Sequence, residues 1–549
     1  MAKHDDLGSL LLRRGMTRRE LLKGAVVIGA GAALAPVAAA CGGGTSTSAT
    51  SPAAVSASPK AGGYLRVATP AGSGKENLNV HEPSLTIPSL DMRFNMYDSL
   101  LEFSPEGVLG MALAESLEPN ADGTQYTARL KSDLVFHDGT PVTADAVVYS
   151  FERILNPKNP GLAAQQLRGL APGGTKKVDK LTVRFELSEP NAIFPEALSA
   201  YSAGIVPVDY DPKGGVGAIG TGPFMLASAD DFKPGQQATF VKNPNYWREG
   251  GGPYVDKITF IEFADTTAQM NALLGGNVEF VQMIPGAQRD VATGEGFELL
   301  EAKTGSWVPF TMNCNVKPFD DVRVRQAFRL IVDRPQMITQ AADGLQWLGN
   351  DMYAPFDPGY PKDLAQRAQD IEQAKSLLKQ AGYDGDLSVT LTTSTAVSNG
   401  APAAATVFAQ QAKAAGVDVK LNNVNGDVFW GDQYLKYQFA MDNWGTRGYL
   451  AQAGFGSLPK AVYNETHWAD QKPEYVELVN QAYKTVDDAA RNELISQAAT
   501  LEYEEGGYII YAFDNQVDAF SPKVAGAVAD FSGLALAACG SRYRLVYFV

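Results

Sequence analysis

The sequence predicts an α/β protein of several domains, and three observations support this prediction. The chain has 549 residues, more than one hydrophobic core usually serves, and at about 100–200 residues per domain it should hold roughly two to four domains. Hydrophobic residues make up 45% and charged residues 19% of the chain, which is typical of a globular protein. Strand and helix patterns alternate between residues 370 and 424, as they do where helices connect parallel strands.

The start of the chain has the features of an export signal. Two adjacent arginines in "TRRELLK" (17–23) precede the uncharged stretch "GAVVIGAGAALAPVAAA" and then Cys41. A basic start, a short apolar middle and small residues before a cleavage site are the parts of a secretory signal, and paired arginines indicate twin-arginine export. The apolar stretch is short and rich in Gly and Ala, which is weak for a membrane span. We therefore expect residues 1–40 to be a signal peptide.

Cys41 is the predicted site of cleavage and lipid attachment. The run "VAAAC" resembles the lipobox of bacterial lipoproteins, with Ala38 where that motif prefers leucine. Alternatively, ordinary signal peptidase could cut after the same small residues. Residues 41–61 are rich in Gly, Ser, Thr and Pro and are expected to form a flexible tether. The prediction is a lipoprotein held at the outer face of a bacterial cytoplasmic membrane.

The ordered body should begin with a strand in "AGGYLRVAT" (61–69). Within residues 122–155, a strand in "QYTARL" and a short run around "LVF" lead to a helix that Thr143 can cap. A second helix is expected in "DVRVRQAFRLIV" (321–332). In both helices apolar residues recur at three- and four-residue steps and should face a core: Val147, Phe151 and Ile154 in the first, Val324, Phe328 and Ile331 in the second.

The clearest unit follows Asp370, which can cap a helix that stops at Gly382. A strand in 387–393, a helix in 403–416 and a strand in 417–424 come next. Strand, helix and strand in this order predict a parallel βαβ crossover. A last helical stretch, about 474–505, precedes the strand-like runs "GGYIIYAFDNQVDAF" and "RYRLVYFV".

Composition and motifs argue against several classes of function. The formal net charge of −15 disfavours binding to nucleic acid or to an anionic membrane surface. The four histidines are far apart, without the spacing of a zinc site, so we expect no metal and no cofactor. "ATPAGSGKEN" lacks the first glycine and the Ser or Thr of a phosphate loop. Cys314 and Cys539 are far apart in the sequence, which does not show whether they form a disulfide. Catalytic signatures are absent from the sequence. We therefore do not expect an enzyme.

Aromatic residues are numerous, with 22 Tyr, 25 Phe and 6 Trp. Most should lie in cores, but a cleft for an organic ligand also needs apolar walls with a few polar anchors. The last third of the chain offers candidates in loop-like places beside glycine or asparagine. The candidate wall residues are Trp430, Trp444, Tyr449, Tyr511 and Phe513.

Several runs, taken in order, resemble the family 5 extracellular solute-binding proteins of ABC importers, the oligopeptide- and dipeptide-binding group. Together they span about residues 62 to 515. The runs are "GGYLRVAT", "DLVFHDGTPVTADAVVYSFERIL", "IGTGPFML", "VKNPNYW", "VKPFDDVRVRQAFRLIVDR" and "IEQAKSLLKQAGYDGD".

The resemblance implies a two-lobed periplasmic-binding-protein-like clamp with an extra inserted domain. Lobe I would combine residues 62–101, 219–305 and 508–549, the inserted domain would be 102–218, and lobe II would be 306–507. A solute would bind between the lobes of a monomer, and closure would be sensed by an ABC permease.

The same resemblance places Arg447 at a ligand-binding position of the family. In peptide-binding members, a strand ends with a tryptophan, and an aspartate three residues later pairs with the peptide's α-amino group. Here Trp444 and Arg447 take these places. An arginine favours carboxylate or phosphate instead. Either Arg447 contacts an anionic or polyhydroxylated ligand, such as an opine-like acid or an oligosaccharide, or it turns outward or pairs with a carboxylate such as Asp442.

The sequence thus predicts a receptor that captures a peptide-like, opine-like or sugar-derived solute. The alternatives are an exported hydrolase acting on peptide or glycan, and a surface chaperone or sensor with the same clamp.

Overall fold

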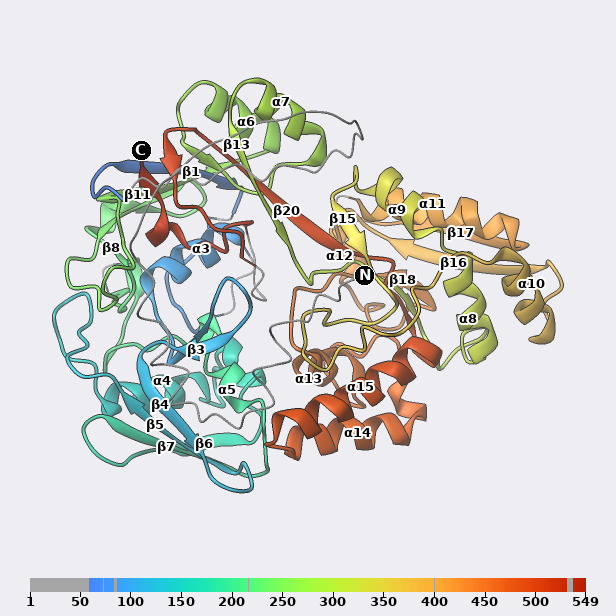
Figure 1. Ribbon diagram of the computed structural model, residues 1–549, viewed down its shortest axis with the longest axis horizontal. Helices are drawn as coiled ribbons and strands as arrows, with labels where there is room; N and C mark the ends of the chain where they lie inside the picture. The colour runs from blue at the N-terminus through green and yellow to red at the C-terminus, as the bar shows by residue number, and fades with distance from the viewer. Residues whose placement is uncertain (1–58, 73, 83–85, 216, 399, 531–536) are drawn as a thin grey trace, which may run out of the picture. The chain divides into compact units, whose positions relative to one another are not determined.

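The computed structural model describes residues 59–72, 74–82, 86–215, 217–398, 400–530 and 537–549 (Figure 1). The chain divides into two units, Met1–Ser56 and Ala57–Val549. The predicted signal peptide, Cys41 and nearly all of the predicted tether lie outside the described residues. Within the described part of the chain, no helix combines the length and apolarity that a membrane crossing requires.

Lobe I is built on a mixed sheet in the order β13-β20-β12-β1-β11-β10-β8, with β9 paired to β10. The ninth strand of this sheet, β15, pairs with the first residues of β20 on the side of lobe II. The predicted first strand is β1, which runs parallel to β11 along its whole length. Helices α3, α6 and α7 pack against this sheet. The bounds are β1 Tyr64–Pro70, α3 Ile87–Met96, β8 Phe224–Leu226, β9 Phe232–Lys233, β10 Gln237–Lys242, β11 Lys257–Phe263, α6 Thr266–Leu274, β12 Phe280–Val281, α7 Arg289–Gly294, β13 Glu298–Lys303, β15 Gln346–Leu348 and β20 Ala512–Phe520.

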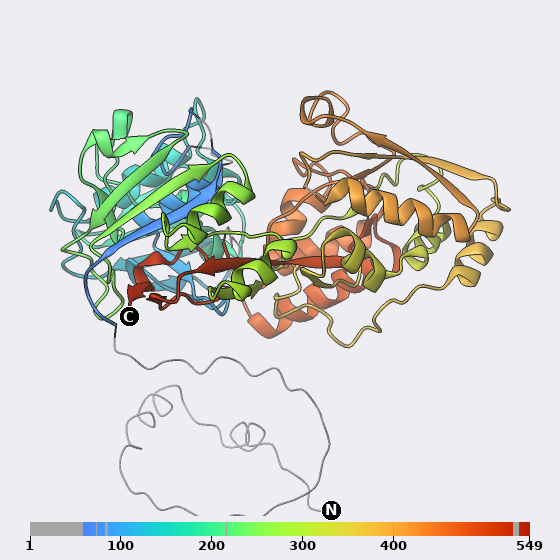
Figure 2. The ribbon, with the colours of Figure 1, turned by 90° about the horizontal axis from the view of Figure 1, so that it is seen from above.

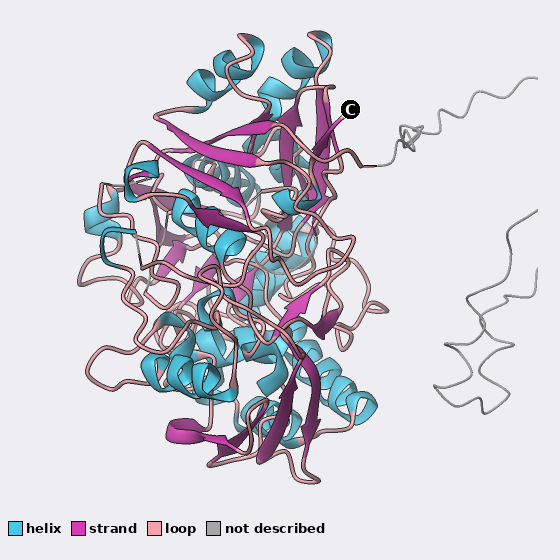
Figure 3. Cartoon of the chain, turned by 90° about the vertical axis from the view of Figure 1, so that its left-hand side faces the viewer, coloured by secondary structure: helices cyan, strands magenta, loops and turns pink. Residues whose placement is uncertain are grey.

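The inserted domain has its own antiparallel sheet, in the order β4-β5-β7-β6, at the opposite end of lobe I from the nine-stranded sheet (Figures 1 and 3). Helix α4 covers it, and Phe151, Phe185 and Phe194 form a separate core. Thr143 precedes α4 as predicted, but it caps through its backbone carbonyl rather than its side chain. The bounds are β2 Leu101–Phe103, β3 Leu109–Met111, β4 Ala114–Pro119, β5 Gln125–Leu130, α4 Ala144–Ile154, β6 Leu170–Lys177, β7 Thr182–Leu187 and α5 Phe194–Ala197.

Lobe II contains a five-stranded sheet in the order β17-β16-β18-β14-β19. The predicted crossover is confirmed, because β16 and β17 are parallel and α11 joins them. Asp370 caps α10 by accepting from the Gln373 amide at 2.9 Å. The bounds are β14 Phe310–Met312, α8 Val322–Ile331, α9 Arg334–Ala341, α10 Ile371–Gln380, β16 Leu387–Thr393, α11 Ala401–Ala414, β17 Val417–Asn423, α12 Gly426–Phe429, β18 Phe439–Met441, α13 Tyr449–Gln452, α14 Pro473–Lys484, α15 Asp488–Glu505 and β19 Tyr508–Ile509.

Two predicted elements differ in detail. The helical stretch 474–505 is two helices, because the chain turns after Lys484 and Asp487 caps α15 through the Ala490 amide at 2.9 Å. Residues 508–509 form β19, which pairs with β14 of lobe II, so the chain returns to lobe I a few residues later than the resemblance implied. The last short strands, β21 Val524–Ala525 and β22 Tyr547–Phe548, pair with each other.

Strand β20 joins the two lobes (Figure 2). Its first three residues pair with β15, which belongs to lobe II in sequence, and Asn515–Phe520 pair with β13 of lobe I. Strand β20 changes its pairing partner at Asp514. The Asp514 amide donates to the Ser306 carbonyl, and the Asp514 carbonyl accepts from the Thr304 amide. Ser306 and Thr304 lie on the second connection between the lobes, which runs from β13 to β14.

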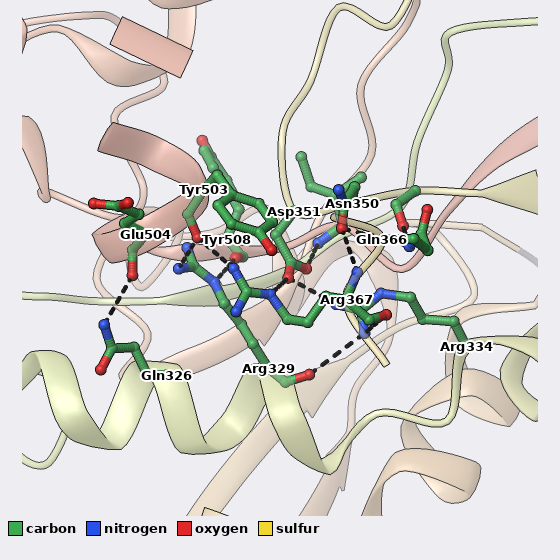
Figure 4. A network of polar contacts seen from close by, with 12 residues as sticks. Gln326, Arg329, Arg334, Asn350, Asp351, Gln366, Arg367, Tyr503, Glu504 and Tyr508 are labelled. Carbon is green, nitrogen blue, oxygen red and sulfur yellow. Dashed lines mark hydrogen bonds and ion pairs between the residues drawn. The ribbon is translucent and has the colours of Figure 1, made fainter. Parts of the chain in front are cut away.

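A buried network of charges lies in lobe II (Figure 4). One oxygen of Asp351 contacts Arg334 at 2.7 Å and Arg367 at 2.8 Å, and the other accepts from the Ile510 amide at 3.1 Å. Arg329 lies nearby and donates to three backbone carbonyls after and within α15. The network therefore fastens α8 and the following loops to the segment that leads into β20.

The two described cysteines are buried and free. Cys314 packs in a lobe II core and Cys539 in a lobe I core, so no disulfide joins them.

Candidate functional site

A cavity of about 890 Å³ lies between the lobes. Lobe I, the inserted domain and lobe II all contribute to its wall, with aromatic rings interleaved with charges. The lining side chains include Tyr201, Arg168 and Glu196 from the inserted domain, Arg542 from lobe I, and Asp357, Arg447 and Phe455 from lobe II.

The loop after β18 forms part of this wall and is fixed from behind. The backbones of Trp444 and Trp307 exchange two hydrogen bonds of 3.0 Å, and their indoles stack with centroids 5.9 Å apart. The Thr446 hydroxyl accepts from the Gly305 amide at 2.9 Å. Trp307 and Gly305 lie on the connection between β13 of lobe I and β14 of lobe II. These contacts therefore fix the loop after β18 to the connection between the lobes.

Arg447 is a lining guanidinium with weak protein partners. Its guanidinium lies over the rings of Trp444 and Phe455, at 5.6 and 5.3 Å, and donates to Gly445 and Gln452 over long distances of 3.4 and 3.5 Å. Among the residues that the structure describes, no carboxylate comes within ion-pair distance of it. Burial lowers its pKa, but an arginine remains charged at any physiological pH.

Asp442 is not the partner of Arg447. It is buried and accepts from the Tyr434 hydroxyl at 2.9 Å and the Asn443 amide at 2.7 Å. It also faces Glu465, and burial raises the pKa of both carboxyls. Because two buried carboxylates cannot both stay charged at contact, the pair retains a proton. Glu465 accepts from the Trp444 indole at 3.0 Å and so anchors the wall. Nothing in the local sequence signals this long-range contact.

Three other lining charges have firmer protein partners. Arg168 pairs with Glu189 at 2.9 Å, and Arg542 pairs with Asp530 and donates to the Phe103 carbonyl. Asp357 accepts from the Tyr449 and Gly359 amides at 2.7 and 2.9 Å.

The structure separates the predicted wall residues. The lining residues include Arg447, while Trp444 lies directly behind it and is 7% exposed. Tyr449 is fully buried, where its hydroxyl donates to Glu502 at 2.8 Å. Tyr511 and Phe513 pack in cores against Phe310 and Trp347. Trp430 is 39% exposed at the end of α12 and packs on Phe429 and Tyr434. The cavity lining does not include the side chains of Tyr449, Tyr511, Phe513 and Trp430.

Sequence reasoning missed the inserted domain's share of the wall. Glu196 lies in the four-residue helix α5 and Tyr201 in a single 3-10 turn, both too short to show a periodic pattern, and only the folding of distant segments brings them to the same cavity as Arg447. In the described part of the chain, no cluster of His, Cys, Asp and Glu has the arrangement of a metal site.

The fold and the inter-lobe cavity define a two-lobed ligand-binding protein. Residues 109–464 match the family described as bacterial extracellular solute-binding proteins, family 5 Middle. The chain belongs to this family, and it is therefore a solute-binding protein of the class that serves ABC importers.

The individual proteins that resemble this chain share about a quarter of its residues or fewer. The glutathione-binding protein GsiB of Escherichia coli (strain K12) is 26% identical over 486 residues, covering 83% of this chain and 90% of GsiB. The solved structure of the PBP AgaA from A. tumefaciens R10, in complex with agropinic acid, matches with a TM-score of 0.72 at 23% identity, covering 89% of this chain and 99% of AgaA. CtaP from Listeria monocytogenes, an ABC transporter substrate-binding protein, gives a TM-score of 0.77 at 22% identity, covering 89% and 100%. At these identities the structural matches establish the fold.

Proposed function

We propose that this protein captures an organic solute carrying a carboxylate or similar acidic group in the inter-lobe cavity and delivers it, chemically unchanged, to an ABC permease. The observation that carries the proposal is Arg447, a half-buried cation in the cavity wall with only long hydrogen bonds to the protein. A desolvated guanidinium without a carboxylate gains most from an anionic ligand, which it can bind through two parallel hydrogen bonds.

Two further facts support an organic acid. The cavity volume lies in the usual range of small-ligand sites, roughly 300–1,000 Å³, and the aromatic rings of Tyr201 and Phe455 offer flat apolar surface beside the charge. GsiB is named for glutathione and AgaA was solved with agropinic acid, and both of these compounds carry carboxylates. A peptide-like, opine-like or sugar-derived acid would meet the same requirements.

The class of solute can be tested by thermal shift and titration calorimetry with glutathione, agropinic acid, carboxyl esters of both, and neutral oligosaccharides. Saturable stabilisation by the acids and weaker binding of the esters are expected. Equal binding of acid and ester would contradict the acidic-group proposal. Hydrolysis of a bound compound, followed by mass spectrometry, would instead support the exported hydrolase.

Arg447→Ala should weaken binding of the identified acid by at least about 1.5 kcal/mol, the scale of a hydrogen bond to a charged group, or roughly tenfold in Kd. Arg447→Lys should retain part of the affinity, because the charge remains while the planar fork is lost. Arg184→Ala is the matched control, since Arg184 lies on the exposed part of β7 and pairs with Glu186. Calorimetry on the three variants gives the answer, and an unchanged Kd for Arg447→Ala would refute the ligand contact.

We also infer that the chain is exported by its twin-arginine signal and anchored by a lipid on Cys41. The sequence pattern of residues 17–41 supports this inference, as does the extracellular setting of the family. The anchored receptor would act as a monomer beside its permease.

A further inference from the structure

The inserted domain and lobe II touch along one side of the cavity. The Ala192 amide donates to the Tyr483 carbonyl at 2.7 Å, and the Arg168 guanidinium lies over the Tyr483 ring at 4.4 Å. Ala192 lies between β7 and α5 of the inserted domain, and Tyr483 lies in the last turn of α14 of lobe II. This contact must break whenever the cavity opens on this side.

Two carboxyl groups face each other beside this contact, one from each side. Glu196 comes from α5 of the inserted domain, and Asp357 comes from a lobe II loop. Both lie against Gly448: a Cβ built on that glycine would be 3.1 Å from Glu196 Oε2 and 3.6 Å from Asp357 Oδ2. Because Gly448 has no side chain, nothing from that residue separates the two acids.

The two acids have different partners. Asp357 is fixed by the amides of Tyr449 and Gly359. For the Glu196 carboxyl, no hydrogen bond or ion pair is formed among the described residues. The other charged or titratable groups that act on Glu196 are Arg491 of α15, whose guanidinium already bonds two backbone carbonyls and Asp488, and the Tyr483 hydroxyl. Glu196 therefore has no cation committed to it in the closed arrangement.

We propose that Glu196 and Asp357 form a proton-dependent latch between the inserted domain and lobe II. A proton on Glu196 lets the two carboxyls lie together and the contact close, and its loss drives the contact apart through like-charge repulsion. The latch concerns the opening of the cavity, so it does not depend on which solute is bound.

The sign of the effect follows from the two environments. In the closed contact, burial and the neighbouring Asp357 raise the pKa of Glu196 to about 7. When the contact opens, the carboxyl returns to water and to an ordinary pKa near 4.5. Between about pH 4.5 and 7 the closed arrangement therefore binds more protons than the open one. The proton's contribution to closure is fully present below about pH 4.5 and is lost, by up to about tenfold per pH unit, as the pH rises to 7.

Hydrogen–deuterium exchange of the full-length chain without ligand tests the latch. Protection at Ala192 and around Tyr483, corrected for the intrinsic pH dependence of exchange, should fall at least about tenfold from pH 5 to pH 8 in the natural protein. In Glu196→Gln it should change by less than about twofold, because the neutral amide needs no proton. Glu118→Gln, an exposed carboxylate on β4 of the same domain, should behave like the natural protein.

Protection of the central strand β5 serves as the internal control, because it reports whether each variant is folded. If the natural protein shows no pH dependence at Ala192, or if Glu196→Gln retains the full dependence while β5 stays protected, the latch is refuted. Neither result would bear on the acidic-solute proposal, which is tested by the ester comparison.

Discussion

At the scale of single residues, buried charge decides where the chain tolerates change. Asp351 has no exposed side-chain surface and neutralises Arg334, which is 1% exposed, and Arg367, which is 13% exposed. The third arginine, Arg329, has its pKa lowered to about 10 by burial, and Asp351 opposes this shift. A buried ion network of this kind contributes little net stability over an apolar core, but the loss of one member leaves uncompensated charge.

Replacing Asp351 with Asn should therefore destabilise the protein by about 3–5 kcal/mol, since two buried guanidiniums lose their only shared carboxylate. Asn preserves the shape and tolerates the positive φ of 61° at this position, so the effect would come from charge. Denaturant unfolding measures it. Asp384→Asn, in an exposed pair with Lys379, should change stability by less than about 1 kcal/mol, and equal losses in both variants would contradict the prediction.

Individual site residues could be predicted only in part. The place of Arg447 in the cavity wall could be expected, because a local run, Trp444 followed three residues later by a charge, matches a family pattern. Glu196 and Glu465 carry no such signal, because each acquires its role from a residue brought near only by folding. The aromatic residues Tyr449, Tyr511 and Phe513 were misleading candidates, since composition alone does not distinguish a ring in a core from a ring in a cleft.

At the scale of elements, the sequence predicted those helices and strands that have their own cap or hydrophobic period. The α10, β16, α11 and β17 series was recognisable because each element has its own cap or period. The three-residue strand β15 was not recognisable, and β19 was not separated from β20 within the strand-like run, because so short a segment has no periodicity and is defined by its distant pairing partner. The division of 474–505 was missed although its signal was present, since Asp487 and Asp488 follow a Thr-Val pair.

The Asp487 cap gives a test at this scale. Asp487→Ala should cost about 1 kcal/mol, because the first turn of α15 loses the acceptor for the Ala490 amide. Asp487→Asn keeps a comparable acceptor and should lose at most a few tenths of that energy. Thermal or urea unfolding of the two variants distinguishes them, and the same loss in both would assign the effect to charge rather than to capping.

At the scale of the whole molecule, the two-lobed arrangement came from the family resemblance, because no local rule states which distant segments share a sheet. Lobe I gathers strands from the start, the middle and the end of the chain into one sheet. In the inserted domain the four strands and α4 are contiguous in sequence, but patterns predicted only the strand in "QYTARL" and the helix, and the domain itself came from the resemblance.

The N-terminal anchor is testable on the whole protein. In the natural host, Cys41→Ser should move the protein from the membrane fraction to the soluble fraction and abolish incorporation of labelled fatty acid, because the acceptor thiol is gone. Ser46→Ala, in the same predicted tether, should leave both properties unchanged. Fractionation and metabolic labelling provide the readout, and membrane retention of Cys41→Ser with label would exclude Cys41 as the lipid site.

The sharing of β20 limits how the solute-loaded state can be recognised. One end of the strand is hydrogen-bonded to lobe I and the other to β15, so sliding one lobe past the other would break a row of backbone hydrogen bonds at once. Torsion about the few bonds near Asp514 breaks far fewer. The signal available to a membrane partner is therefore an angle between two rigid faces rather than a displacement, and solutes of different length would be distinguished by how far they let that angle close.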